Sequence, residues 1–115
     1  MKVGFIGLGN VGKKLANSLL NNHVDLTVMD LNTKVLSEFK KNGACIANSA
    51  KDLSMNVDLI ITCLPSPNVC SEVMESNNGV IKGIKKNTIW LEMSTTDESE
   101  VRRLGKLIIE KGSVP

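Results

Sequence analysis

A glycine-rich loop near the start of the chain constrains the fold more than any other feature. Residues 7–12 are GLGNVG, a G-x-G-x-x-G pattern. The residues before this loop are mostly apolar and partly β-branched, as in a short strand, and the apolar residues after it recur at the spacing of one helix face. A strand, a glycine turn and a helix in this order form the setting in which such a loop binds a dinucleotide.

The three glycines of the loop have separate expected roles. Gly7 permits the tight turn out of the strand, Gly9 lets the backbone approach a pyrophosphate, and Gly12 lets the helix pack closely on the strand. The free N–H groups and the positive dipole end at the start of the helix then face the phosphates. The loop residues that we expect to contact the dinucleotide are Gly7, Leu8, Gly9, Asn10, Val11 and Gly12.

An acidic residue, Asp30, closes the predicted second strand 18 residues after Gly12. At this position a carboxylate accepts hydrogen bonds from the hydroxyls of the adenosine ribose, and its charge disfavours a 2′-phosphate. Leu31 and Asn32 follow, where a site that prefers NADP more often has an arginine. We therefore predict NAD rather than NADP as the cofactor, with Asp30 and Leu31 at the site. The alternative is an ordinary turn aspartate.

Strand and helix patterns alternate along the rest of the chain. Segment 57–64 is almost continuously apolar, which is typical of a parallel strand that is covered on both faces. The pattern predicts a single α/β domain over residues 1–115, a Rossmann-type doubly wound parallel sheet with helices on both faces. Further strands are predicted over residues 24–29, 44–47 and 88–93, and helices after a Thr33 cap, over 48–55 with a Ser49 cap, over 68–75, and up to about 111, with a turn-rich segment at 80–86.

Two strand ends carry residues that we expect at the ligand edge of such a sheet. The fourth strand ends at Leu64 and Pro65, and the fifth is followed by three hydroxyl residues in a row, Ser94 to Thr96. Ligands bind beyond the carboxyl ends of parallel strands, where these residues meet the glycine loop. Thr95 also has capping-box spacing to Glu98, so the hydroxyls either begin the last helix or contact cofactor or substrate.

Composition disfavours several other classes of protein. The net charge of +2 is dispersed and aromatic residues are scarce, so no nucleic-acid surface is expected. No apolar run has the length of a membrane span, and no signal peptide precedes the first strand. The three cysteines form no C-x-x-C pair, which predicts neither a disulfide framework nor a metal site, but reduced thiols in a cytoplasmic protein.

Three motifs make the chain resemble the β-hydroxyacid dehydrogenases, such as 3-hydroxyisobutyrate dehydrogenase and tartronate semialdehyde reductase. The family opens with G-L-G-x-M-G, ends its fourth strand in Leu-Pro, and ends its fifth in D-x-S-[ST]. The likeness covers the whole chain, with departures. The matching stretches are residues 7–12, 64–65 and 92–95, and the departures are Val11 and Leu15 for methionine, Ser18 for asparagine, Glu92 for aspartate, and Glu98 for proline.

The resemblance implies hydride transfer between nicotinamide and a small 3-hydroxy acid similar to 3-hydroxyisobutyrate. It implies that residues 9–12, Asp30, Leu64, Pro65 and Thr95 contact NAD, and that Ser94 lies near the substrate carboxylate or the nicotinamide. The family's catalytic lysine lies on a later helix, and its helical second domain completes the site and forms the homo-oligomer. No catalytic residue is therefore expected in residues 1–115, and this chain alone should have little or no turnover.

Two other functions share the opening motif. One is an NAD-binding sensor or regulatory module without chemistry, which would have no need of Leu64-Pro65 together with Ser94-Thr95. The other is a reductase similar to pyrroline-5-carboxylate reductase, which also opens with a strand and a Gly-Asn turn. The run at residues 63–67, CLPSP, argues against the second.

Overall fold

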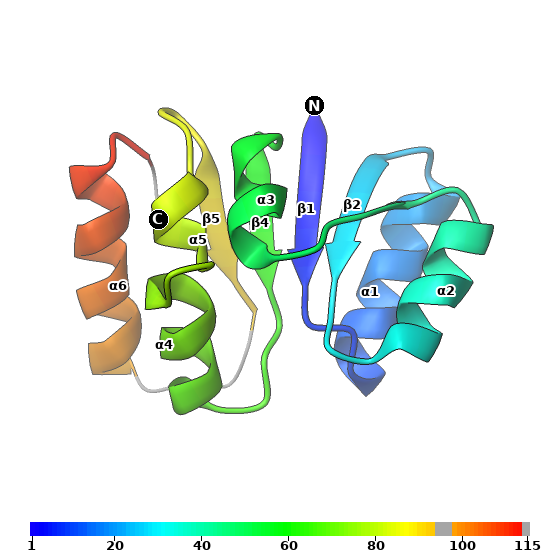
Figure 1. Cartoon of the computed structure of the whole chain (residues 1–115), viewed down its shortest axis with the longest axis horizontal. Helices are drawn as coiled ribbons and strands as arrows, with labels where there is room; N and C mark the ends of the chain where they lie inside the picture. Colours follow the sequence, from blue (N-terminus) through cyan, green and yellow to red (C-terminus); the bar gives the residue numbers. More distant parts are fainter. Residues whose placement is uncertain (94–97, 114–115) are drawn as a thin grey trace.

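The computed structural model describes residues 1–93 and 98–113. Five strands form one sheet in the order β3-β2-β1-β4-β5, and all neighbours are parallel (Figure 1). This is the order of a dinucleotide-binding doubly wound sheet up to its fifth strand, so the predicted fold is confirmed. The strands are β1 (Lys2–Ile6), β2 (Asp25–Met29), β3 (Cys45–Ile46), β4 (Leu59–Thr62) and β5 (Ile89–Glu92).

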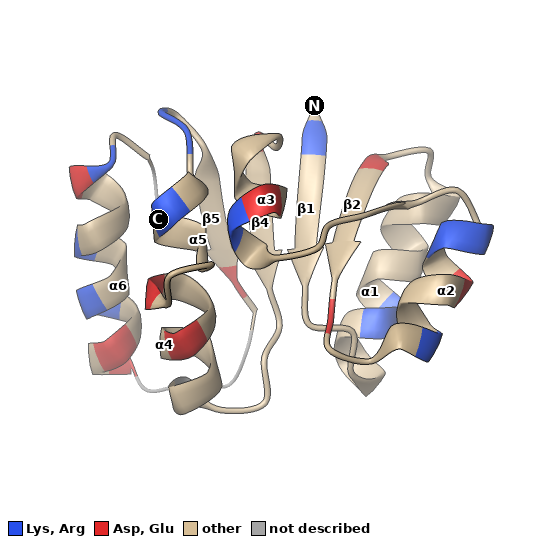
Figure 2. Cartoon of the chain, in the orientation of Figure 1, with Lys and Arg blue, Asp and Glu red and all other residues tan. Residues whose placement is uncertain are grey.

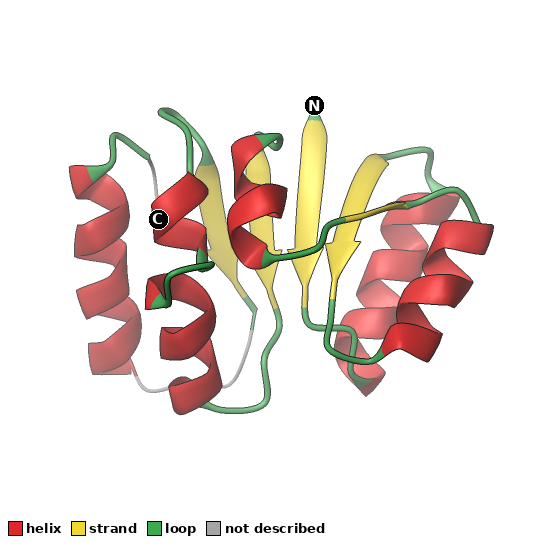
Figure 3. Ribbon diagram, viewed as in Figure 1, coloured by secondary structure: helices red, strands yellow, loops and turns green. Residues whose placement is uncertain are grey.

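Helices cover both faces of the sheet (Figure 3). Two of them pack on one face, and the other four contribute to the apolar core on the opposite face. Both signs of charge occur among the helices that the structure describes, and some of these helices carry residues of one sign only (Figure 2). The first pair is α1 (Asn10–Asn21) and α2 (Thr33–Lys41), and the second set is α3 (Ala50–Met55), α4 (Pro67–Glu75), α5 (Val80–Gly83) and α6 (Glu98–Glu110).

The central strands supply side chains to both cores because successive residues of a strand point to opposite faces. In β1, Phe5 belongs to the core under α1 and α2, and Ile6 belongs to the other core. In β4, Ile61 belongs to the core under α1 and α2, and Ile60 belongs to the other core. Both strands are almost fully buried, which explains why segment 57–64 is nearly continuously apolar.

The predicted N-terminal cap is confirmed for α3 but not for α2. The Ser49 cap of α3 is confirmed, since its hydroxyl accepts the Asp52 N–H at 3.1 Å. The Thr33 cap is wrong, because Asn32 caps α2 and its side-chain oxygen accepts the Lys34 N–H at 3.0 Å. Asn32 has the extended backbone that a cap requires, whereas Thr33 is already helical. The segment predicted as turn-rich contains the single helical turn α5.

Strand β5 is covered on only one face. Trp90 is buried in the core formed with α3 to α6. Leu91 and Met93 point to the side of α1 and remain 44% and 47% exposed. Across residues 1–93 and 98–113, no helix is both long and apolar enough to span a membrane.

Candidate dinucleotide-binding site

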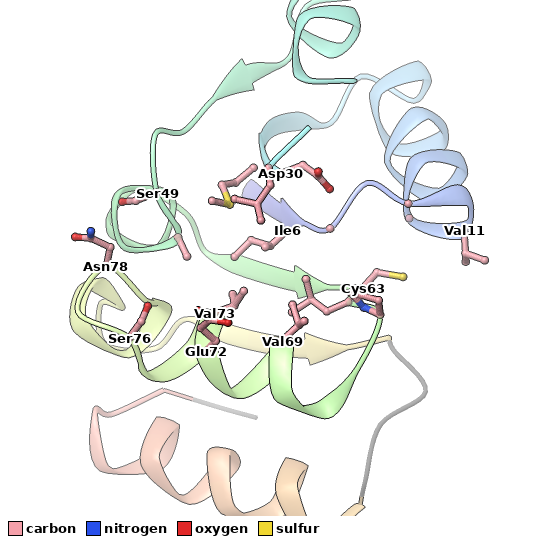
Figure 4. Close-up of a pocket in the computed structure, with 18 of the residues that line it drawn as sticks. Ile6, Val11, Asp30, Ser49, Cys63, Val69, Glu72, Val73, Ser76 and Asn78 are labelled. Carbon is pink, nitrogen blue, oxygen red and sulfur yellow. The ribbon is translucent and has the colours of Figure 1, made fainter. Parts of the chain in front are cut away.

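A pocket of about 820 Å³ lies at the carboxyl edge of the sheet, between the glycine loop, the end of β2 and helix α4 (Figure 4). This is the edge at which doubly wound sheets bind ligands, and the volume is within the usual range for small-molecule sites. Most of the predicted site residues come together here. The predicted residues that line the pocket are Gly7, Gly9, Asn10, Val11, Gly12, Asp30, Leu31, Leu64 and Pro65.

Two glycines of the loop are required by the fold itself. Gly7 has φ of +101°, and a Cβ there would lie 2.1 Å from the Cys63 carbonyl oxygen. A Cβ on Gly12 would lie 2.1 Å from the Gly7 carbonyl oxygen. Both atoms belong to the backbone and cannot move aside cheaply. The roles expected for Gly7 in the turn and Gly12 in helix packing therefore agree with the geometry.

Gly9 differs from its two neighbours in the motif. A Cβ there would meet nothing within 4 Å, and its φ of −68° is open to any residue. Gly9 is the N-cap of α1 and provides no side-chain hydrogen bond to the first turn, whereas α2, α3 and α4 are each capped by a side-chain oxygen. The start of α1 therefore presents backbone N–H groups to open space. That geometry fits a pyrophosphate, which binds through such groups and the positive helix end.

Asp30 connects the end of β2 to the glycine loop. Its Oδ2 accepts the Leu8 N–H at 2.6 Å, and its Oδ1 accepts the Asn32 N–H at 2.8 Å. A carboxylate has about four acceptor positions, so about two remain for ribose hydroxyls. The carboxylate lines the pocket while holding the loop in place.

Leu8 does not line the pocket, although we expected it to contact the cofactor. Its side chain is 4% exposed and packs in the core under α1 and α2, and its N–H is bonded to Asp30. Leu31, the other leucine predicted near the start of the site, does line the pocket and is 91% exposed. The structure thus separates a residue that supports the loop from one that is free to meet a ligand.

Several pocket residues were not predicted from the sequence. Val69, Glu72 and Val73 of α4, together with the residue that caps its carboxyl end, Ser76, follow an i, i+3, i+4, i+7 spacing. All four line the pocket (Figure 4). The sequence analysis predicts a helix over residues 68–75 but assigns none of these four residues to the site. The signal that could have identified them is their helical spacing after Pro65, which places two polar residues on the same face as two valines. Ile6, Met29, Asn48, Ser49, Ala50, Cys63 and Asn78 also line the pocket.

The predicted residues Ser94 and Thr95 lie outside the described residues, as does the capping box with Glu98. The end of β5 just before them is anchored. Glu92 Oε2 accepts the Thr62 hydroxyl at 2.7 Å and the Cys70 thiol at 3.0 Å. Thr62 Oγ1 in turn accepts the Trp90 indole N–H at 2.9 Å. Glutamate in place of the family's aspartate therefore reaches both β4 and α4.

The lining of the pocket includes the thiol of Cys63. Partial burial raises the pKa of the Cys63 thiol, and the charge of Glu92 adds to that shift, so the thiol is protonated at neutral pH. Within the described residues, no group of three His, Cys, Asp or Glu side chains could hold a metal ion. The arrangement can hold and orient a dinucleotide at the sheet edge.

Comparison with known proteins gives the family. The model of the NAD-binding domain of 6-phosphogluconate dehydrogenase matches residues 2–114. The chain is 38% identical to mitochondrial 3-hydroxyisobutyrate dehydrogenase of Rattus norvegicus over 112 residues, which is 97% of this chain and 33% of that protein. It is 31% identical to 2-(hydroxymethyl)glutarate dehydrogenase of Eubacterium barkeri, over 97% of this chain and 37% of that protein.

Solved structures agree on the fold. The crystal structure of 3-hydroxyisobutyrate dehydrogenase from Salmonella typhimurium superposes with a TM-score of 0.90 at 23% identity, over 98% of this chain and 39% of that one. The chain spans about a third of the length of the relatives that it matches. With its glycine loop, its Asp30 and its sheet order, this chain belongs to the β-hydroxyacid dehydrogenase family, as an N-terminal NAD-binding domain.

Proposed function

We propose that this domain holds NAD for a dehydrogenase that acts on a small 3-hydroxy acid similar to 3-hydroxyisobutyrate. The observation that carries the proposal is the start of α1, where Gly9 leaves open space and no side chain caps the first turn. Asp30 lies beside it in the same pocket. A helix start binds an anion such as a pyrophosphate, and a carboxylate binds the hydroxyls of a sugar. Together the two groups suit one half of a dinucleotide.

Each residue of the site has a proposed role in binding. The first N–H groups of α1 would bind the pyrophosphate, and Asp30 would accept hydrogen bonds from the ribose and disfavour a 2′-phosphate. Leu64 and Pro65 would direct the cofactor along the sheet edge, toward Thr95 and the substrate contact Ser94. When bound, the nicotinamide supplies or accepts the hydride. The residues of this chain bind and orient.

The remaining parts of the reaction are proposed to lie in the rest of a longer protein. The relatives are about three times as long as this chain, which covers 33% of the rat enzyme. We propose that the catalytic lysine, the helical domain and the homo-oligomer contacts belong to that additional length. On its own, this chain is expected to bind NAD without turnover.

A titration with NADH and, separately, NADPH tests the binding proposal, with nicotinamide fluorescence as the readout. Saturable binding of NADH with much weaker binding of NADPH is expected. Equal affinity for both would contradict the role of Asp30. Absence of binding to either would contradict the assignment of the pocket.

Turnover by the full-length protein separates the remaining functions. Oxidation of 3-hydroxyisobutyrate or a related 3-hydroxy acid is expected. Reduction of pyrroline-5-carboxylate in its place would favour the reductase alternative. Binding of NAD without turnover of either compound by the full-length protein would favour a sensor or regulatory module.

A further inference from the structure

We propose that Glu72 recognises the exocyclic amine of the adenine in the bound dinucleotide. The inference rests on the proposed NAD site and adds a specificity determinant to it. Glu72 lies on α4, and its side chain lines the same pocket as Asp30 and the glycine loop (Figure 4).

The pocket itself indicates where the base must lie. The start of α1 is suited to the pyrophosphate and Asp30 to the adenosine ribose. In a dinucleotide the adenine is attached to that ribose, on the side away from the pyrophosphate. The pocket continues past Asp30 to the wall formed by α4 and the turn after it, so this wall is the part left for the base (Figure 4).

The wall has an apolar part and a polar rim. Val69 and Val73, one helical turn apart, present the apolar surface that a flat purine needs. Glu72, Ser76 and Asn78 form the polar rim at the far end, away from the glycine loop (Figure 4). A base that lies against the two valines brings its polar edge to these three residues.

The rim is held rigidly by its backbone. The Asn78 carbonyl accepts the Lys51 N–H of α3 at 2.8 Å, and the Ser76 N–H donates to the Glu72 carbonyl at 3.0 Å. A Cβ on Gly79 would lie 2.6 Å from the Val73 carbonyl oxygen, so the turn packs directly against the end of α4. Such support preorganises a binding edge, which lowers the entropy cost of recognition.

The Glu72 carboxylate is available for a ligand. Within the described residues it makes no hydrogen bond and no ion pair, whereas its neighbour Glu75 binds Arg103 at 2.6 Å through both oxygens. An ionised carboxylate only accepts hydrogen bonds, and the 6-amino group of adenine only donates them. A base with a carbonyl oxygen at the same position would bring two acceptors together.

The test compares NADH with nicotinamide hypoxanthine dinucleotide (reduced), in which a carbonyl replaces the 6-amino group. The two compounds carry the same charge, so the ratio of their dissociation constants isolates the contact to the base. The protein is expected to prefer NADH by about tenfold or more, the effect of one hydrogen bond to a charged group. In Glu72→Gln, whose amide can also donate to a carbonyl, the ratio should fall toward one.

Glu110→Gln is the matched control, since it removes the same charge from the exposed end of α6. It should leave the ratio as in the unmodified protein. Equal affinity of the unmodified protein for both dinucleotides, or a ratio unchanged in Glu72→Gln, overturns the role of Glu72 but leaves the NAD site intact. Failure of the unmodified protein to bind either compound overturns the site as well.

Discussion

At the scale of single residues, Gly12 is required by the fold, whereas Gly9 is expected to be required only for ligand binding. The Cβ of Gly9→Ala would enter open space, so the midpoint of thermal unfolding should stay within a few degrees while NADH affinity falls because the methyl group occupies the approach to α1. The Cβ of Gly12→Ala would lie 2.1 Å from a carbonyl oxygen, so stability should fall by about 1–3 kcal/mol or more. Calorimetry and NADH titration check both, and unchanged affinity in Gly9→Ala would contradict the pyrophosphate position.

The Asp30 carboxylate has a structural role, and we propose that it also recognises the ribose of the cofactor. Asp30→Ala removes the acceptors for the Leu8 and Asn32 N–H groups as well as the charge that is proposed to face the ribose. The preference for NADH over NADPH should therefore fall by about 1–3 kcal/mol, as measured by parallel titrations. Asp30→Asn keeps one acceptor oxygen and should lose the same preference with less damage to the loop. An unchanged ratio of affinities in both variants would show that the carboxylate does not read the ribose.

At the scale of elements, Thr62 joins β4 to β5 through a buried hydroxyl. It accepts the Trp90 N–H and donates to Glu92, and the side chain is 0% exposed. Thr62→Val leaves the indole N–H buried without a partner, at an expected cost of about 1–3 kcal/mol in urea unfolding. Emission of Trp90, the single tryptophan, should change as well. Thr62→Ser keeps the hydroxyl and should lose less, and equal losses in the two variants would count against the hydrogen bonds.

Arg103 holds α6 against α4. Its guanidinium binds both oxygens of Glu75 at 2.6 Å and also pairs with Glu100, which accepts the Ser71 hydroxyl at 2.5 Å. These hydrogen bonds, that of Arg103 first, lower the pKa of Glu100 from 4.5 to about 2. A carboxyl whose pKa is lower in the folded state stabilises the fold above its unfolded pKa. That stabilisation is lost as the pH falls from about 4.5 to about 2.

Arg103→Gln should therefore unfold more easily than the unmodified protein at pH 7, and the difference should shrink as the pH approaches 2. Urea unfolding across this range measures it. Arg102→Gln is the control, because its partner Glu98 is 78% exposed and such surface pairs contribute little. Identical pH profiles for the two variants would contradict the role of Arg103.

At the scale of the whole molecule, the two faces of β5 differ in their importance for stability. Leu104 of α6 is fully buried against one face, and Leu91 is 44% exposed on the other. Leu104→Ala should cost about 2–5 kcal/mol in unfolding free energy. Leu91→Ala should cost clearly less, because fewer contacts and less buried area are lost. Similar losses at both positions would indicate that the exposed face of β5 is covered in solution.

Local patterns predicted much of this molecule because they act within a few residues. The period of two in the strands, the helical spacing and the turn glycines each reflect one backbone conformation and one buried face. Those patterns placed β4, the Ser49 cap and the glycine loop correctly. Helix ends were less secure, as at Asn32 and Thr33, because either residue type can cap and only the backbone angles distinguish them.

The sequence by itself determined the parallel sheet, the loop at its carboxyl edge and the acidic residue beside it, since each depends on short-range geometry or on the order of elements. Only the tertiary structure decided that Asp30 would bond to Leu8, that Thr62 would join Trp90 to Glu92, and that Glu72 would line the pocket. These are contacts between segments far apart in the chain. Their partners are selected by how whole helices and strands pack, which no local period records.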